Sequence, residues 1–129
     1  MKEEYPGVDI VDSVESFEDA SITYQKTVEL LQKYPELRGI YITCGGTSEV
    51  GRALQESGRT RQITVLSYED YPKILDLIRD GTINCTLSSD LQRQGALSVK
   101  VIMDYLVFGS KPKQEQLFTE IRILVKESL

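Results

Sequence analysis

Three segments of the chain carry side chains whose types and spacing could do chemistry: Tyr68-Glu69-Asp70, Thr43-Cys44-Gly45-Gly46 and Ser88-Ser89-Asp90. The first places two carboxylates directly after an apolar run. Carboxylates in that position can bind the hydroxyl groups of a sugar, hold Mg²⁺ or cap the helix that follows. The third segment either caps a helix or forms a hinge between two lobes. The residues alone leave these alternatives open.

The second segment could be a cysteine nucleophile or a phosphate loop, and the sequence argues against both. Cys44 stands at a strand-to-helix elbow, but the chain contains no histidine to act as its base. Gly45-Gly46 lacks both the Gly-x-Gly-x-x-Gly spacing and a Walker lysine. We therefore expect no catalytic residue, no cofactor and no enzymatic activity. The missing histidine also excludes metal sites that rely on imidazole, and we assign no metal ligand. The glycines instead allow the backbone to turn sharply or to approach a ligand closely.

The composition narrows the classes of function further. The chain has 129 residues, 40% of them hydrophobic and 27% charged, which suits one domain with a real core. Its net charge of −5 opposes direct nucleic-acid binding, because phosphate binding needs a basic face. Arg52, Arg59 and Arg61 form a small basic cluster that we expect to be solvated surface. No apolar run is long enough to span a membrane, and we expect no membrane association.

The cysteines and the N-terminus bear on the compartment. Cys44 and Cys85 fall within apolar runs, and we expect buried free thiols rather than a bridge. Thiols of this kind favour a reducing compartment, and the first residues lack an apolar segment of signal-peptide type. We therefore expect a cytoplasmic protein, with an exported one as the alternative.

The apolar patterns predict alternating strands and helices. A half-buried strand is expected over residues 8–14, and buried strands near 40–42, 63–68, 82–89 and 121–125. Helices are expected over about 20–34, 47–57 and 91–108, and from Pro72 to Gly81, with Thr47 or Ser48 capping the second helix and Asp90 the last. This order predicts one α/β domain, a parallel sheet of about five strands with helices on both faces.

The helix over 91–108 does not suit a small closed domain. Its apolar residues cover more than one face: Leu91, Leu97, Val99, Val101, Ile102, Tyr105, Leu106 and Phe108. An amphipathic surface helix buries a single stripe. We expect another layer, a second lobe or a partner chain to cover this helix.

Taken in order, these segments resemble the C-terminal lobe of the effector-binding domain in LacI-type transcription regulators, a fold shared with type I periplasmic sugar-binding proteins. The resemblance rests on Cys44-Gly45-Gly46 with Gly51 one turn on, and on the strand end 65–70. It also rests on Asp80-Gly81-Thr82-Ile83 and Gln94-Gly95 and extends over nearly the whole chain, from about Pro6 to Val125.

The resemblance implies a set of ligand-binding residues. These are Phe17 for stacking, Gly45 and Gly46 for backbone approach, Tyr68 and Glu69 for hydroxyl recognition, and Ser89 as a hinge and hydrogen-bonding residue. Three positions depart from the family pattern: Glu69 replaces the common Asp, Ser89 a common Gln, and Gly45-Gly46 the commoner Asn-Asp. The departures are compatible with a sugar-like ligand and leave its identity open.

The resemblance also implies the function and the partners of the chain. It predicts a piece of a longer two-lobed protein, in which a small sugar-like ligand closes this lobe against an N-terminal lobe. In a regulator, closure would control DNA binding by a separate head, and we expect a homodimer. The alternative is the same lobe of an exported solute-binding protein of a sugar transporter. A third alternative, less favoured by the residues, is an enzyme on a flavodoxin-like sheet.

Overall fold

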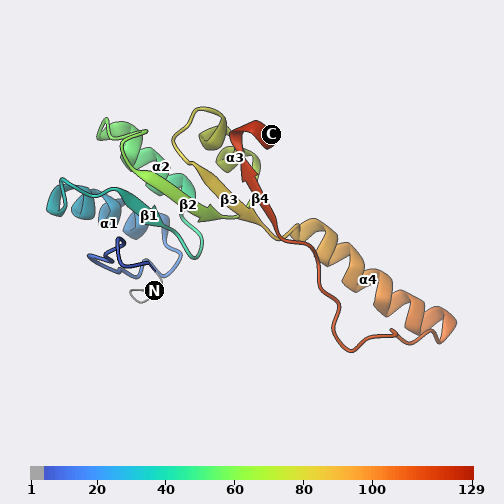
Figure 1. The fold of residues 1–129 in the computed structure, drawn as a ribbon. Coiled ribbons are helices and arrows are strands. Elements are labelled where there is room, and N and C mark those ends of the chain that lie inside the picture. Colours follow the sequence, from blue (N-terminus) through green and yellow to red (C-terminus); the bar gives the residue numbers. More distant parts are fainter. Residues whose placement is uncertain (1–4) are drawn as a thin grey trace.

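The computed structural model describes residues 5–129 and contains alternating helices and strands (Figure 1). In chain order they are α1 (Ala20–Lys33), β1 (Gly39–Tyr41), α2 (Thr47–Glu56), β2 (Thr64–Tyr68), α3 (Pro72–Arg79), β3 (Cys85–Ser88), α4 (Leu91–Phe108), β4 (Arg122–Val125) and a 3-10 turn (Lys126–Ser128). The predicted α/β class with a mainly parallel sheet is confirmed. None of the helices within 5–129 has the length and apolar character needed to cross a membrane.

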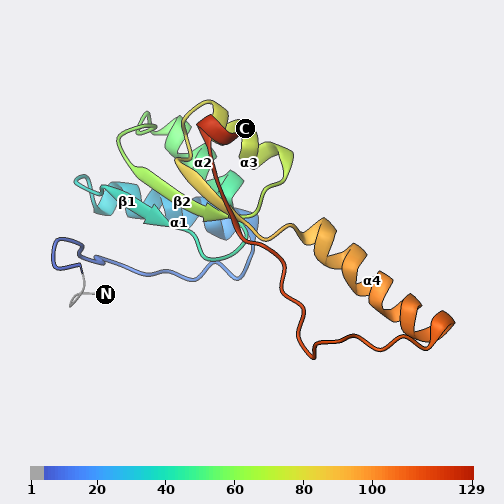
Figure 2. The ribbon, with the colours of Figure 1, turned by 45° about the vertical axis from the view of Figure 1, so that its right-hand side comes forward.

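The sheet follows the order of the chain, β1-β2-β3-β4. β1 pairs with β2, and β2 with β3, in parallel; Ile40 lies opposite Val65. β4 runs antiparallel to β3, with Arg122 opposite Ser88. The expectation that the last strand would also be parallel is therefore wrong. The reason is that α4 leads away from the sheet and the chain returns from its far end, so β4 enters from the opposite direction (Figures 1 and 2).

The strand expected over residues 8–14 does not form, and the described sheet has four strands rather than five. Its apolar side chains are exposed; Ile10, for example, is 64% accessible. The segment is instead held by Asp12, whose Oδ2 accepts hydrogen bonds from Lys33 Nζ and the Tyr34 hydroxyl, both at 2.9 Å. An alternating pattern becomes a strand only beside another strand, and the sheet described here ends at β1.

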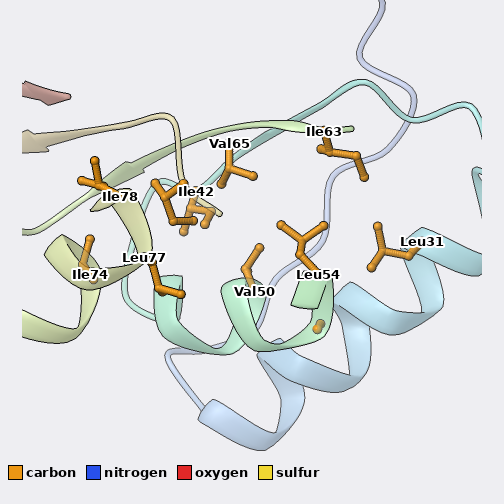
Figure 3. Packing of buried hydrophobic residues seen from close by; sticks show 11 residues of the cluster. Leu31, Ile42, Val50, Leu54, Ile63, Val65, Ile74, Leu77 and Ile78 are labelled. Atoms are coloured by element: carbon orange, nitrogen blue, oxygen red, sulfur yellow. The ribbon is translucent and has the colours of Figure 1, made fainter. Parts of the chain in front are cut away.

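The core lies on one face of the sheet, between β2 and helices α1, α2 and α3. Along β2, Val65 and Ser67 are buried, whereas Leu66 and Tyr68 on the opposite face are exposed. Figure 3 shows the buried cluster, in which side chains of α2 and α3 meet those of the sheet: Leu31, Ile42, Val50, Ala53, Leu54, Ile63, Val65, Ile74, Leu77, Ile78 and Ile83.

Helices on both faces were expected, but the three packed helices share this one face. Right-handed crossovers between strands that follow chain order place successive helices on the same side. Over the described residues, the face that carries Leu66 and Tyr68 has no helical cover comparable to the core face.

α4 has the predicted bounds and its predicted cap, since Asp90 Oδ1 accepts a hydrogen bond from Arg93 N at 3.0 Å. None of its 18 residues is buried. The helix projects away from the sheet in both ribbon views (Figures 1 and 2). That a second lobe or partner covers it stays a prediction.

Arg59 departs from the expectation of a solvated basic cluster. Its guanidinium donates hydrogen bonds to four carbonyl oxygens at the end of α1 and just after it, at 2.7–3.3 Å: Leu31, Tyr34, Pro35 and Leu37. The last carbonyls of a helix lack partners within the helix. Arg59 therefore closes α1 and fixes the turn that leads into β1.

Candidate functional site

The carboxyl ends of three parallel strands meet at one edge of the sheet and surround a cavity. Thr43-Cys44-Gly45 follows β1, Glu69-Asp70 follows β2 and Ser89 follows β3. The cavity has a volume of about 230 Å³ and its lining comprises Glu18, Thr43, Cys44, Gly45, Tyr68, Glu69, Asp70, Ser89 and Leu91. Ligands of open α/β sheets bind at this edge, because the loops there converge.

Four of the six residues predicted for the site line this cavity: Gly45, Tyr68, Glu69 and Ser89. They come from three strand ends that are distant in sequence, and the fold brings them together. Phe17 and Gly46 are not among the lining residues.

Gly46 contacts α1 rather than the cavity. It is the N-cap of α2 with φ 105°, and an added Cβ would lie 2.7 Å from Thr23 Cγ2. The glycine therefore allows α1 and α2 to pack closely. The expected side-chain cap is wrong, because Thr47 is already the first residue of the helix and no side chain caps it. The Thr47 Oγ1 is buried without a hydrogen-bond partner.

Phe17 is 79% exposed, so it does not pack as a hydrophobic staple at the start of α1. Phe17 and Glu18 both adopt left-handed backbone conformations, with φ 52° and 58°. This turn brings Glu18, rather than Phe17, into the cavity lining. Stacking of Phe17 on a ligand stays a prediction.

Tyr68 combines an aromatic ring with a hydroxyl at the cavity. Its ring pairs with that of Tyr41 on the neighbouring strand, with centroids 6.4 Å apart and planes tilted by 49°. A hydrogen bond to the Tyr68 hydroxyl is the main reason that the pKa of Tyr41 is raised. The pair fixes the Tyr68 ring beside the cavity and leaves it 36% exposed. Such a ring can pack against the apolar face of a sugar.

Glu69 is held in a left-handed conformation with φ 82°. β3 determines its position from both sides, since Glu69 N donates to the Leu87 carbonyl (3.1 Å) and its own carbonyl accepts from the Thr86 hydroxyl (2.6 Å). The carboxylate Oε2 is buried and has no hydrogen-bond partner among the described residues. The pKa of the neighbouring Tyr71 hydroxyl is raised, mainly by burial and then by the Glu69 carboxylate.

The Asp70 carboxylate, unlike Glu69 Oε2, has partners within the described chain. Its Oδ2 accepts a hydrogen bond from the Ser88 hydroxyl and lies 4.0 Å from Arg122 Nη2. Arg122 also reaches Asp90 Oδ2, at 3.7 Å. This network connects the cavity to the two chain segments that lead into and out of α4.

Ser89 belongs to those connecting segments. Its carbonyl accepts hydrogen bonds from Gln94 Nε2 at 2.7 Å and from the Thr119 hydroxyl at 3.3 Å. Asp90 follows in a left-handed conformation, with φ 52°. Both earlier alternatives for 88–90 are therefore compatible with the structure: Asp90 caps α4, and Ser89 lies where the chain leaves the sheet.

Five lining residues were absent from the predicted set: Glu18, Thr43, Cys44, Asp70 and Leu91. Asp70 had a signal, because it adjoins Glu69 after a buried strand. The sequence contained no signal for Glu18, since its place depends on the left-handed turn at 17–18.

Cys44 is exposed and Cys85 half-buried, so the expectation of two buried thiols is wrong; both are free.

Comparisons with known proteins agree with this geometry. Residues 1–111 match the family described as the periplasmic binding protein domain. None of the curated proteins compared with the chain matches it.

Several solved structures share the fold. A glucose-galactose binding protein from Geobacillus stearothermophilus is 22% identical with a TM-score of 0.85, and the match covers 98% of this chain and 45% of that one. A periplasmic solute-binding protein from Actinobacillus succinogenes with bound D-allose is 17% identical with a TM-score of 0.88, over 98% and 44%. A solute-binding protein from Burkholderia graminis in complex with D-arabinose is 21% identical with a TM-score of 0.86, over 97% and 44%.

The chain thus spans less than half the length of these structures. The family match covers most of the sequence, and the fold and the strand-end cavity accord with it. The chain belongs to the periplasmic binding protein domain family.

Proposed function

We propose that this chain binds a sugar or sugar derivative in the strand-end cavity and supplies one side of a ligand cleft. The observation that carries the proposal is the convergence of Tyr68, Glu69 and Ser89 on one cavity with Gly45. The aromatic ring can pack against the face of a sugar, and the carboxylate can accept hydrogen bonds from its hydroxyl groups. The glycine lets a ligand approach the backbone closely. The proposed role is binding without catalysis.

The solute-binding role for a transporter is the better supported of the two binding functions that the sequence left open. Two of the similar structures named above are ABC transporter solute-binding proteins that hold sugars, and the third is a glucose-galactose binding protein. An exported location goes with that role. The regulator role would need a DNA-binding head elsewhere in the protein, and no observation on this chain favours it.

The proposal is tested by titrating ¹⁵N-labelled chain with D-glucose, D-galactose, D-allose and D-arabinose. Because the chain supplies one side of the cleft, we expect weak binding, which amide chemical shifts detect. The amides of Gly45, Tyr68, Glu69 and Ser89 should shift with at least one of these sugars.

The matched variant is Glu69→Ala. Loss of a hydrogen bond to a charged acceptor costs about 1.5–3 kcal/mol, so affinity should fall about ten- to a hundredfold. Glu115→Ala, which removes an exposed acid of the 109–121 segment, should leave binding unchanged. Unchanged affinity in Glu69→Ala would remove Glu69 from the site. Cavity amides unmoved by every sugar would contradict the proposed function itself.

A further inference from the structure

The charged side chains that line the cavity are all negative. Three carboxylates line it, those of Glu18, Glu69 and Asp70, and its lining within residues 5–129 includes no lysine or arginine. The other lining residues are apolar or neutral. A ligand that enters therefore meets negative charge from this lobe.

The three carboxylates are not equivalent. The charge of Asp70 is partly balanced by Arg122 and by the Ser88 hydroxyl. Neither Glu18 nor Glu69 takes part in any ion pair found over residues 5–129. The two glutamates thus retain the capacity to bind a cationic or donor group.

Glu69 has the most specific requirement. Its Oε2 is buried without a hydrogen-bond partner, while both of its backbone groups are fixed by β3. A buried carboxylate oxygen without a donor is unfavourable by an amount comparable to a lost hydrogen bond. Because β3 fixes the backbone of Glu69 beside the cavity, its carboxylate stays among the lining groups, where a ligand can supply a donor.

We propose that this lobe selects a sugar carrying a protonated amine, with the amine against Glu69, and rejects sugars that carry a carboxylate or phosphate. The inference rests on the proposed sugar-binding function. An ammonium group can donate a hydrogen bond to the Glu69 carboxylate and also compensates negative charge in the cavity. A hydroxyl supplies only the donor. An anionic substituent would be placed near three carboxylates without a lining cation.

The experiment compares matched ligands in the same amide-shift titration of the full chain. D-glucose is compared with D-glucosamine and D-glucuronate, and D-galactose with D-galactosamine and D-galacturonate, at a mildly acidic pH where the amines are protonated. For the hexose that shifts the cavity amides, the amine should bind about tenfold more tightly than the parent sugar, because its charge adds an ion pair to the hydrogen bond that a hydroxyl already makes with the carboxylate. The uronate should bind more weakly than the parent sugar.

Glu69→Gln separates charge from shape. In this variant the advantage of the amine over the parent hexose should disappear, because the amine loses an ion pair as well as a charged acceptor, whereas the parent hexose loses only the charged acceptor. Glu115→Gln makes the same change in net charge on an exposed loop residue and should preserve the advantage.

The outcomes distinguish the two proposals. If neither hexose nor its amine shifts the cavity amides, the proposed function fails. If a hexose binds but its amine binds no better, or its uronate binds better, only the selectivity for amines fails. An amine advantage that survives in Glu69→Gln would likewise overturn the assignment of the amine to Glu69.

Discussion

At the residue scale, two adjacent glycines in the elbow after β1 have different physical roles. Gly46 has φ 105° and its position excludes a Cβ, which would lie 2.7 Å from Thr23 Cγ2 and 2.9 Å from Thr23 Oγ1. Gly45 has no positive φ, a Cβ added there would meet no atom within 4 Å, and the residue lines the cavity. Gly46 therefore allows the two helices to pack closely, whereas Gly45 leaves space for a ligand at the cavity.

Gly46→Ala should lower the free energy of unfolding by about 2–4 kcal/mol, because it combines an unfavourable left-handed backbone with overpacking against a buried threonine. Gly45→Ala, the matched control, should change it by less than about 0.5 kcal/mol, as surface substitutions usually do. Urea denaturation measures both. Equal effects of the two substitutions would contradict the assignment of different roles.

Gly45→Ala also has a consequence for binding. A methyl group at this position points toward open space beside the cavity, so the variant should bind sugar more weakly while its stability is retained. The amide-shift titration of the same protein sample checks this, and unchanged affinity would place the ligand away from Gly45.

The cavity residues show what could be predicted from the sequence at this scale. Gly45, Tyr68, Glu69 and Ser89 were predictable because each follows an apolar run, and parallel strands end at one edge. Glu18 was not, because left-handed φ values at two successive non-glycine residues have no local sequence signal. The packing role of Gly46 could not be predicted for a related reason: the side chain that it accommodates, Thr23, belongs to another helix.

At the element scale, helix ends were predicted well and sheet membership was not. Pro72 begins α3, Asp90 caps α4, and Gly81 follows α3 in a left-handed conformation. Each of these features depends only on the backbone of neighbouring residues, so the local sequence predicts it. A strand, by contrast, exists only through a neighbour. The alternation over 8–14 therefore could not reveal that no strand lies beside this segment within the described chain. In the same way, the apolar pattern at 121–125 could not reveal that β4 is antiparallel to β3.

The Asp12 carboxylate contributes to the attachment of the 8–14 segment at the end of α1, beside a hydrogen bond from the Tyr34 hydroxyl to the Val11 carbonyl at 3.3 Å. Hydrogen bonds from Lys33 and then Tyr34 lower the pKa of Asp12 below its ordinary value of 3.8. A carboxyl whose pKa is lower in the folded state stabilises the attachment above its ordinary pKa and loses this effect as the pH falls through the lowered value. The contribution of Asp12 to the attachment should therefore be complete near neutral pH and be lost only in acid.

The Ser13 amide reports this transition, since it donates a hydrogen bond to Asp12 Oδ1 at 2.9 Å. In an NMR pH titration its shift should change with a midpoint below 3.8. Asp12→Asn should weaken the attachment at neutral pH, seen as faster hydrogen exchange of the Ser13 amide, whereas Glu15→Gln in the same exposed region should not. A Ser13 midpoint at or above the ordinary Asp value would contradict the attachment.

At the scale of the whole molecule, two apolar surfaces lack cover within the described chain. α4 has no buried residue, and Leu106 and Phe108 are 70% and 76% exposed. The sheet face opposite the core exposes Tyr41, Leu66 and Ile123 at 59%, 41% and 65%. Exposed apolar area of this kind drives association, because burying it releases about 25 cal/mol per Å².

The chain on its own should therefore self-associate as its concentration rises, through α4, through the open sheet face or through both. Sedimentation velocity over a series of concentrations measures this, and a clean monomer at high concentration would contradict it. The double variant Ile102→Glu with Leu106→Glu should shift the distribution toward monomer without loss of stability, since neither residue is buried. Gln92→Glu with Gln114→Glu adds the same charge at exposed polar positions and should leave association nearly unchanged. If both double variants reduce association equally, net charge rather than the apolar surface of α4 is the cause.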